Sequence, residues 1–133
     1  MKLKNLKTIL ATSMLVVFGL ALMSSISLQK PWDVPAKFKT MKNSSKADAA
    51  AGKELWNKNC ASCHGKTGIG DGPKSRTLET SPANFTKAPF QAQTDGEIFY
   101  KTKFGRGEMP KYEGKIGDDE IWQLVNFMRG FKK

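Results

Sequence analysis

The chain has 133 residues, of which 39% are hydrophobic and 26% are charged, and its formal net charge is +10. Its two cysteines and single histidine are too few for a zinc site of four cysteine or histidine ligands, so such a site would need a carboxylate as its fourth ligand. No interleaving of aromatic and basic residues on a recognisable nucleic-acid fold accompanies the charge. We therefore expect no nucleic-acid partner and interpret the charge as solvation with some attraction to acidic partners or anionic membranes.

The first residues of the chain have the pattern of an export signal. Lys2, Lys4 and Lys7 precede an apolar stretch from residue 9 to residue 23. Cleavage after Ser27 would make residues 1–27 the signal peptide, and the loss of three lysines and no acid would lower the net charge from +10 to +7. An uncleaved membrane anchor is the alternative, because residues 8–29 carry no charge and about 20 apolar residues span a bilayer. Both alternatives place the remaining chain in the periplasm or at the periplasmic face of the inner membrane, with membrane contact through residues 8–29 if they are retained.

Residues 28–46 predict an extended N-terminal arm. They contain Pro31 and Pro35 and show no sustained hydrophobic period. Trp32 and Phe38 are more apolar than a flexible spacer requires. We therefore expect the arm either to act as a spacer or to pack on the domain or on a partner.

Residues 47–133 predict one small domain, beginning with a helix over about residues 48–59. Asp48 suits the positive end of the helix dipole, and Leu55 and Trp56 form an apolar face. Gly52 lies on the same face as Trp56, although glycine in a helix costs about 1 kcal/mol relative to alanine. This position predicts the close approach of another helix.

The residues that follow, Cys60-Ala61-Ser62-Cys63-His64, form a C-x-x-C-H motif. Two thiols on one helical turn fit covalent attachment of one c-type haem, with the adjacent imidazole as an axial ligand of its iron. A thioredoxin-like redox pair, a plain disulfide and zinc are the other interpretations, but a redox pair expects a strand before the motif. The export signal favours haem, since c-type haem is attached outside the cytoplasm. Cys60 and Cys63 are therefore the expected anchors, and His64 is the expected iron ligand.

Three further segments lie between the motif and the last predicted helix. Residues 65–73 are rich in turn-forming residues and predict a loop that can wrap past a flat ligand. Thr94 and Glu97 have the spacing of a capping box and predict a helix that ends at Gly105. An irregular segment follows this helix and carries Met109.

The last predicted helix covers residues 118–131 and has acids in its first turn and basic residues at its end. Its apolar residues follow the spacing i, i+3, i+4, i+7, so one side should be buried. The expected partner is the first helix, with Phe127 over Gly52. The apolar positions are Ile121, Leu124, Val125 and Met128.

The haem iron needs a second axial ligand, and the chain has no second histidine. Once residues 1–27 are removed, the methionine candidates are Met41, Met109 and Met128. Met128 falls in the apolar stripe of the last helix, and Met41 falls in the arm. Met109 precedes a proline in an irregular segment, so it is the expected ligand.

With these residues in place, residues 47–133 resemble a class I c-type cytochrome of the bacterial single-haem kind. The resemblance rests on Gly52 and Trp56, the C-A-S-C-H motif, the G-D-G-P turn at 70–73, the G-E-M-P segment at 107–110 and the final helix. It implies a small all-α cytochrome c fold of three to four helices wrapped around one covalent haem. It also implies that the carbonyl of Pro73 accepts the Nδ1 proton of His64. The haem-pocket residues implied by the resemblance are Leu78, Phe99, Tyr112 and Trp122.

Methionine opposite histidine raises the reduction potential of a haem and leaves no open iron position. The sequence therefore predicts a one-electron carrier, not an enzyme, between a quinol-oxidising complex or dehydrogenase and a terminal acceptor. We expect a rim of lysines to steer redox protein partners toward the haem. The rim lysines are Lys66, Lys87, Lys101 and Lys111.

Two alternative functions are also compatible with the sequence. One is a fixed haem c subunit of a membrane respiratory complex. The other is a haem enzyme or gas sensor with open iron.

Overall fold

The structure is a computed structural model that describes residues 30–46 and 48–132. The chain divides after Pro31, and residues 32–133 form one unit. The predicted signal peptide, residues 1–27, lies outside the described residues. Within the described ranges, no helix has both the length and the apolar character needed to cross a membrane.

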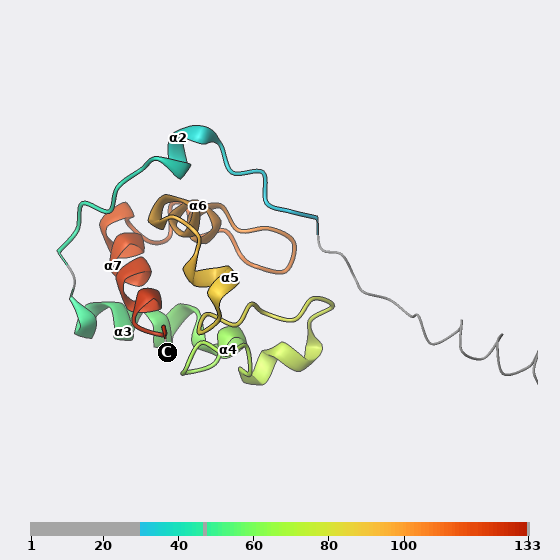
Figure 1. Cartoon of the computed structure of the whole chain (residues 1–133). Coiled ribbons are helices and arrows are strands. Elements are labelled where there is room, and N and C mark those ends of the chain that lie inside the picture. Colours follow the sequence, from blue (N-terminus) through green and yellow to red (C-terminus); the bar gives the residue numbers. More distant parts are fainter. Residues whose placement is uncertain (1–29, 47, 133) are drawn as a thin grey trace, which may run out of the picture. The chain divides into compact units, whose positions relative to one another are not determined.

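The described residues form helices and no β-strand, with one isolated bridge between Arg106 and Met109. This confirms the predicted all-α fold. Three helices are of ordinary length and the others are single turns or a short 3₁₀ segment (Figure 1). The elements are α2 (Ala36–Lys39), α3 (Ala49–Asn59), α4 (Ala61–His64), the 3₁₀ helix η1 (Pro73–Thr77), α5 (Ala88–Gln91), α6 (Asp95–Phe104) and α7 (Asp118–Arg129).

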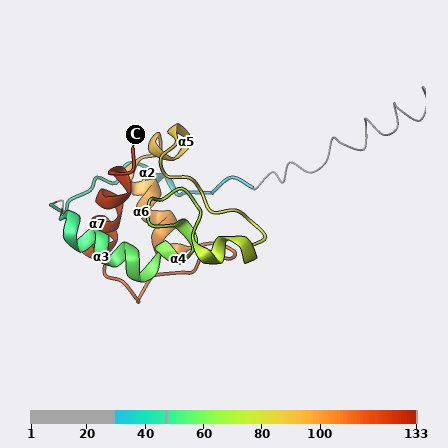
Figure 2. The ribbon, with the colours of Figure 1, turned by 90° about the horizontal axis from the view of Figure 1, so that it is seen from below.

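Helices α3 and α7 pack directly against each other, and both Figure 1 and Figure 2 show them side by side. A Cβ atom built on Gly52 would lie 2.8 Å from the carbonyl oxygen of Gln123 and 2.8 Å from the Cβ of Phe127. The glycine is therefore needed for the crossing, which confirms the expected position of Phe127. Asp48 caps α3 by accepting hydrogen bonds from the next helical amides, and its own amide donates to the Gln123 side chain.

Helix α6 completes the core against α7. The predicted capping box is present, because the Thr94 hydroxyl accepts from the Glu97 amide and the Glu97 carboxylate accepts from the Thr94 amide. Helix α7 ends at Arg129, two residues before the predicted end, and Gly130 turns the chain. The buried apolar side chains are Trp56, Phe85, Phe90, Ile98, Phe99, Ile116, Ile121, Trp122, Leu124, Val125 and Met128.

The N-terminal arm, residues 28–46, is not extended throughout its described part. Residues 36–39 form α2, and Phe38 packs against rings of α6, with centroid distances of 4.8 Å to Tyr100 and 5.7 Å to Phe104. A Cβ atom on Gly96 would collide with the carbonyl oxygen of Phe38. The sequence pattern missed this helix because a single turn has no measurable hydrophobic period.

Candidate haem site

The C-x-x-C-H motif lies where α3 passes into α4. The amide of Cys60 donates to the carbonyl of Trp56, and the amides of Cys63 and His64 both donate to the carbonyl of Cys60, at 3.2 and 2.9 Å. These bonds place two thiols and one imidazole on a single helical turn. Both cysteines are free thiols.

The Cys60 thiol is held in its neutral form. Burial, followed by the charge of the neighbouring Cys63, raises the pKa of Cys60 to about 12. Addition of this thiol across a vinyl group of a porphyrin would form a thioether.

The imidazole of His64 is held neutral as well. Burial lowers its pKa, and an interaction with the backbone of Ala83 partly opposes this effect. Neutral imidazole is the form that binds metal. Its Nδ1 atom is buried and has no hydrogen-bond partner among the described residues.

The Pro73 carbonyl accepts no hydrogen bond from Nδ1 in this structure, and its role toward His64 stays a prediction. Pro73 is exposed and begins η1, while the backbone group that interacts with His64 belongs to Ala83. Before Pro73, the amide of Gly70 donates to the His64 carbonyl and the amide of Gly72 donates to the Cys63 carbonyl. These two bonds attach the loop to the backbone of the motif. The segment that contains Ala83 lies beside the imidazole of His64.

The glycine loop, residues 65–72, wraps closely against the motif as predicted. A Cβ atom on Gly72 would lie 2.5 Å from the carbonyl oxygen of Ser62, so only glycine fits there without a shift. The carbonyl of Gly68 accepts from the amide of Phe85 at 2.7 Å. The loop thus joins the motif on one side to the segment that contains Ala83 and Phe85 on the other.

Aromatic rings surround the imidazole. The ring of His64 lies 4.7 Å from that of Phe85 and 5.8 Å from that of Trp56, measured between centroids. The indole of Trp56 donates to the carbonyl of Gly65 at 3.0 Å, and Phe85 stacks on Phe90 at 4.1 Å. Sequence reasoning missed Phe85 and Phe90, which lie in an irregular stretch and a single-turn helix that carry no usable period.

The pocket residues implied by the resemblance divide into three places. Phe99 and Trp122 are buried and stacked, with their centroids 4.2 Å apart, and they join α6 to α7. Leu78 is half-buried at the end of η1. The hydroxyl of Tyr112 donates to the carbonyl of Asn59 at 2.6 Å, directly before the motif.

Tyr112 is also close to the two thiols. Burial is the main cause that raises the pKa of Tyr112 to about 12, and the charges of Cys60 and Cys63 add to it. Its hydroxyl therefore stays protonated and continues to donate its hydrogen bond at neutral pH. This bond ties the segment after Met109 to the end of α3.

Met109 lies in a tight loop that is braced from within and from outside. Arg106 and Met109 exchange two backbone hydrogen bonds of 3.0 and 3.1 Å, and Gly105 has a φ of +58° with the Met109 carbonyl beside it. The Glu108 carboxylate accepts from the amides of Glu79 and Thr80 at 3.2 and 3.1 Å. The loop is therefore fastened to the segment after Leu78.

The other two methionines have different surroundings. Met128 is 4% exposed and belongs to the core, whereas Met41 is 41% exposed. The thioether of Met109 is half-buried in its braced loop. Of the three candidates, only Met109 combines partial burial with a fixed loop outside the core.

These residues fit a covalent haem. The motif offers two free thiols on one turn and, beside them, a neutral imidazole. In the described part of the chain, no cluster of three or more histidine, cysteine or acidic residues could hold a bare metal ion instead. The donor set therefore suits a metal carried by a macrocycle that the thiols can bind.

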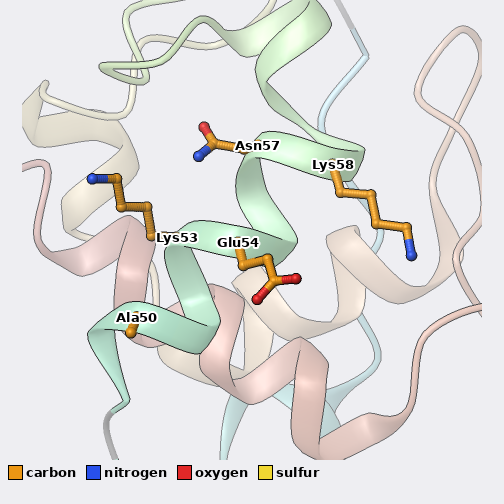
Figure 3. Close-up of a pocket in the computed structure, with 5 residues that line it drawn as sticks. All are labelled: Ala50, Lys53, Glu54, Asn57 and Lys58. Atoms are coloured by element: carbon orange, nitrogen blue, oxygen red, sulfur yellow. The ribbon is translucent and has the colours of Figure 1, made fainter.

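A hollow on the outside of α3 is unrelated to this site. Figure 3 shows that its lining comes entirely from that helix, and all the lining residues are exposed. The lining residues are Ala50, Lys53, Glu54, Asn57 and Lys58.

Residues 47–128 match the protein family described as cytochrome C oxidase, cbb3-type, subunit III. The chain belongs to the class I c-type cytochromes. This cytochrome is 35% identical over 82 residues to cytochrome c6 of Leptolyngbya boryana, which covers 62% of this chain and 91% of that protein. It is 32% identical over 75 residues to cytochrome c6 of Chlorolobion braunii, covering 56% of this chain and 81% of that one.

Solved structures agree. The KustC0563 c-type cytochrome has 31% identity and a TM-score of 0.55, covering 62% of this cytochrome and 98% of its own chain. A chain of the Kuenenia stuttgartiensis reducing HAO-like protein complex Kustc0457/Kustc0458 has 22% identity and a TM-score of 0.59, covering 83% of this chain and 50% of its own; it supports the fold alone. The cytochrome therefore carries covalently bound haem c and is an electron carrier, not an enzyme.

Proposed function

We propose that this cytochrome is exported to the periplasm and carries single electrons from a quinol-oxidising complex or dehydrogenase to a terminal acceptor. The observation that carries the proposal is the turn that presents the thiols of Cys60 and Cys63 beside the neutral imidazole of His64. These thiols would hold one haem, which would supply a reversible one-electron iron couple, and the imidazole would bind its iron. The pattern of lysines and apolar residues at the start of the chain supports export.

Met109 is the second axial ligand in this proposal. Its loop is held by the two backbone bonds to Arg106 and by the Glu108 carboxylate, so little ordering is left to complete when the thioether meets the iron. A thioether opposite histidine favours ferrous iron and raises the reduction potential. With His64 and Met109 both bound, the iron would have no open position for a substrate or gas.

Exposed lysines give the surface a means of attracting acidic redox partners. Lys66, Lys87 and Lys111 are exposed, and Lys111 forms a surface ion pair with Glu113. Lys101 differs from these three, because it is half-buried and its ammonium donates to Gln93. Electron-transfer encounters bury below about 1,200 Å², so a few exposed charges are enough to steer them.

A fixed haem c subunit of a membrane respiratory complex is the second candidate function. The family description favours it, since it names a subunit of cbb3-type cytochrome oxidase. Retention of residues 8–29 as an anchor would suit this role. Membrane fractionation of the full chain with salt and carbonate washes separates the two: a free carrier appears in the periplasmic extract, and an anchored subunit stays in washed membranes.

The ligand assignment is tested by replacing Met109 with alanine in the haem-loaded protein. Loss of the thioether should remove the ferric methionine-to-iron absorption band, lower the potential and allow carbon monoxide to bind the ferrous form. Met128→Ala is the matched control, because it removes a core methionine and should cost about 2 to 5 kcal/mol of stability with the iron spectrum unchanged. An unchanged spectrum in Met109→Ala, or a lost ligand band in Met128→Ala, would show that the wrong methionine was chosen.

A further inference from the structure

The N-terminal arm contacts the loop that carries Met109. The guanidinium carbon of Arg106 lies 4.3 Å from the centre of the Trp32 ring. The ammonium of Lys101 lies 5.9 Å from the same ring, and the ring of Tyr100 meets it edge-on at 6.5 Å. Trp32 is half-buried by these contacts. An aromatic face attracts cations at such distances.

Trp32 is held in place by the residues that follow it. Val34 is only 4% exposed, and the ring of Phe38 packs among rings of α6. The carbonyl of Phe38 lies so close to Gly96 that no larger residue fits there. The arm is therefore fixed on α6 over this stretch, so Trp32 can restrict the movement of Arg106, which it contacts.

Arg106 transmits this contact to the proposed ligand. Its amide donates to the Met109 carbonyl and its carbonyl accepts from the Met109 amide, which closes the four-residue loop. The Glu108 carboxylate fastens the middle of the same loop to the amides of residues 79 and 80. The loop is thus held on one side by the segment after Leu78 and on the other by Trp32.

Two cations, Arg106 and Lys101, share the Trp32 ring. Burial is the main cause that lowers the pKa of Lys101; the Glu97 carboxylate opposes this effect, and the positive charges of Arg106 and Lys39 add to it. The two cations at the ring repel each other. The face of Trp32 offsets that repulsion for Arg106, so without the ring the guanidinium has reason to move away and take the loop with it.

We propose that Trp32 is a positioning residue that, through Arg106, holds the Met109 loop in the arrangement that binds the iron. The inference rests on the proposed role of Met109. Residues 32–38 would then help to hold the second axial ligand of the iron, and they also anchor the start of the domain. A loop that carries a ligand exchanges between an arrangement in which the ligand is on the metal and one in which it has left the metal. A contact made only in the first arrangement raises the population of that arrangement.

The test is the apparent affinity of the haem-loaded ferric protein for imidazole, which binds only where Met109 has left the iron. Trp32→Leu keeps apolar bulk and removes the ring face, so its apparent affinity for imidazole should rise about threefold to tenfold. This change corresponds to about 0.6 to 1.4 kcal/mol, which is the range of a partly exposed cation–π contact. Trp32→Phe keeps a ring face and should stay within about twofold of the wild type.

Two further variants separate positioning from a merely structural role. Met41→Ala truncates an exposed arm residue and should leave imidazole affinity unchanged. The double variant Trp32→Leu/Arg106→Gln should bind imidazole no more tightly than the stronger of its two single variants, because both changes remove the same contact. A melting curve for each variant shows whether the protein remains folded during the titration.

Unchanged imidazole affinity in Trp32→Leu, even with a lower melting temperature, would overturn the proposal, and so would additive effects in the double variant. Failure of the ligand assignment has a different signature. If Met109 does not bind the iron, Met109→Ala leaves imidazole affinity unchanged. If only the brace is wrong, Met109→Ala still raises that affinity strongly while Trp32→Leu does not.

Discussion

Replacing Gly52 with alanine tests the crossing of α3 and α7, which sets where α3 delivers the haem-binding motif. In an ordinary helix the change would stabilise the protein by about 1 kcal/mol. Here the new methyl group would lie 2.8 Å from the Gln123 carbonyl oxygen and 2.8 Å from the Cβ of Phe127. Both atoms are on or next to the backbone, so no side-chain rotation relieves the overlap and the two helices must separate.

Overpacking of a core typically costs about 1 to 3 kcal/mol, and the rigidity of these neighbours favours the upper end. After the gain in helix propensity is subtracted, we expect Gly52→Ala to lower the free energy of unfolding by about 1 to 2 kcal/mol. For a domain of this size the melting temperature should fall by about 5 to 15 °C. Thermal unfolding of the haem-loaded protein, followed by circular dichroism, measures it.

Gly130→Ala is the matched control for this experiment. Gly130 has a φ of −64°, and an added methyl group would meet only the carbonyl oxygen of Phe127 at 3.1 Å. This position follows the end of α7 and should change stability by less than about 0.5 kcal/mol, as is usual for surface substitutions. A Gly52→Ala variant as stable as the wild type or more stable would refute the reasoning, because it would mean that the helices are not in contact at this point.

Two further predictions concern the motif and its neighbour. Replacing Cys60 and Cys63 together by alanine should abolish covalent haem, since the chain has no other thiol; haem retained on a denaturing gel would contradict the attachment site. Tyr112→Phe should cost about 1 kcal/mol, because the Asn59 carbonyl loses its donor. Burial, the main cause, raises the pKa of Tyr112 above its ordinary value, so the stability difference from the wild type should be constant below about pH 10 and fade at higher pH. Melting curves of both proteins across this range would show a pH-independent difference if the hydroxyl bond were absent.

Local patterns in the sequence predicted much of the fold. The capping box at Thr94, the acids that begin α7 and the apolar period along it are interactions between residues three or four positions apart, so they can be read without a structure. The C-x-x-C-H motif is readable for the same reason, because one turn of helix joins its thiols and imidazole. Gly52 and Phe127 were paired correctly, since a glycine on an apolar helix face needs a close neighbour.

Contacts between irregular segments were decided by the tertiary structure. The contact of Phe85 with His64 and the hydrogen bonds of the Glu108 carboxylate to distant amides join residues whose separation in the chain carries no period. The axial role of Met109 stays a prediction, while its braced loop is a property of the fold.

The arm shows the division between sequence and structure most clearly. Its prolines and missing period indicate an extended chain, and Trp32 and Phe38 indicate only that something should cover them. The covering surface on α6 is created by Gly96 and by aromatic residues that come together only after α6 has folded. The sequence by itself therefore determined the cofactor and the principal helices, since both depend on short spacings. The tertiary structure decided what holds the Met109 loop, since that depends on surfaces that do not exist in the unfolded chain.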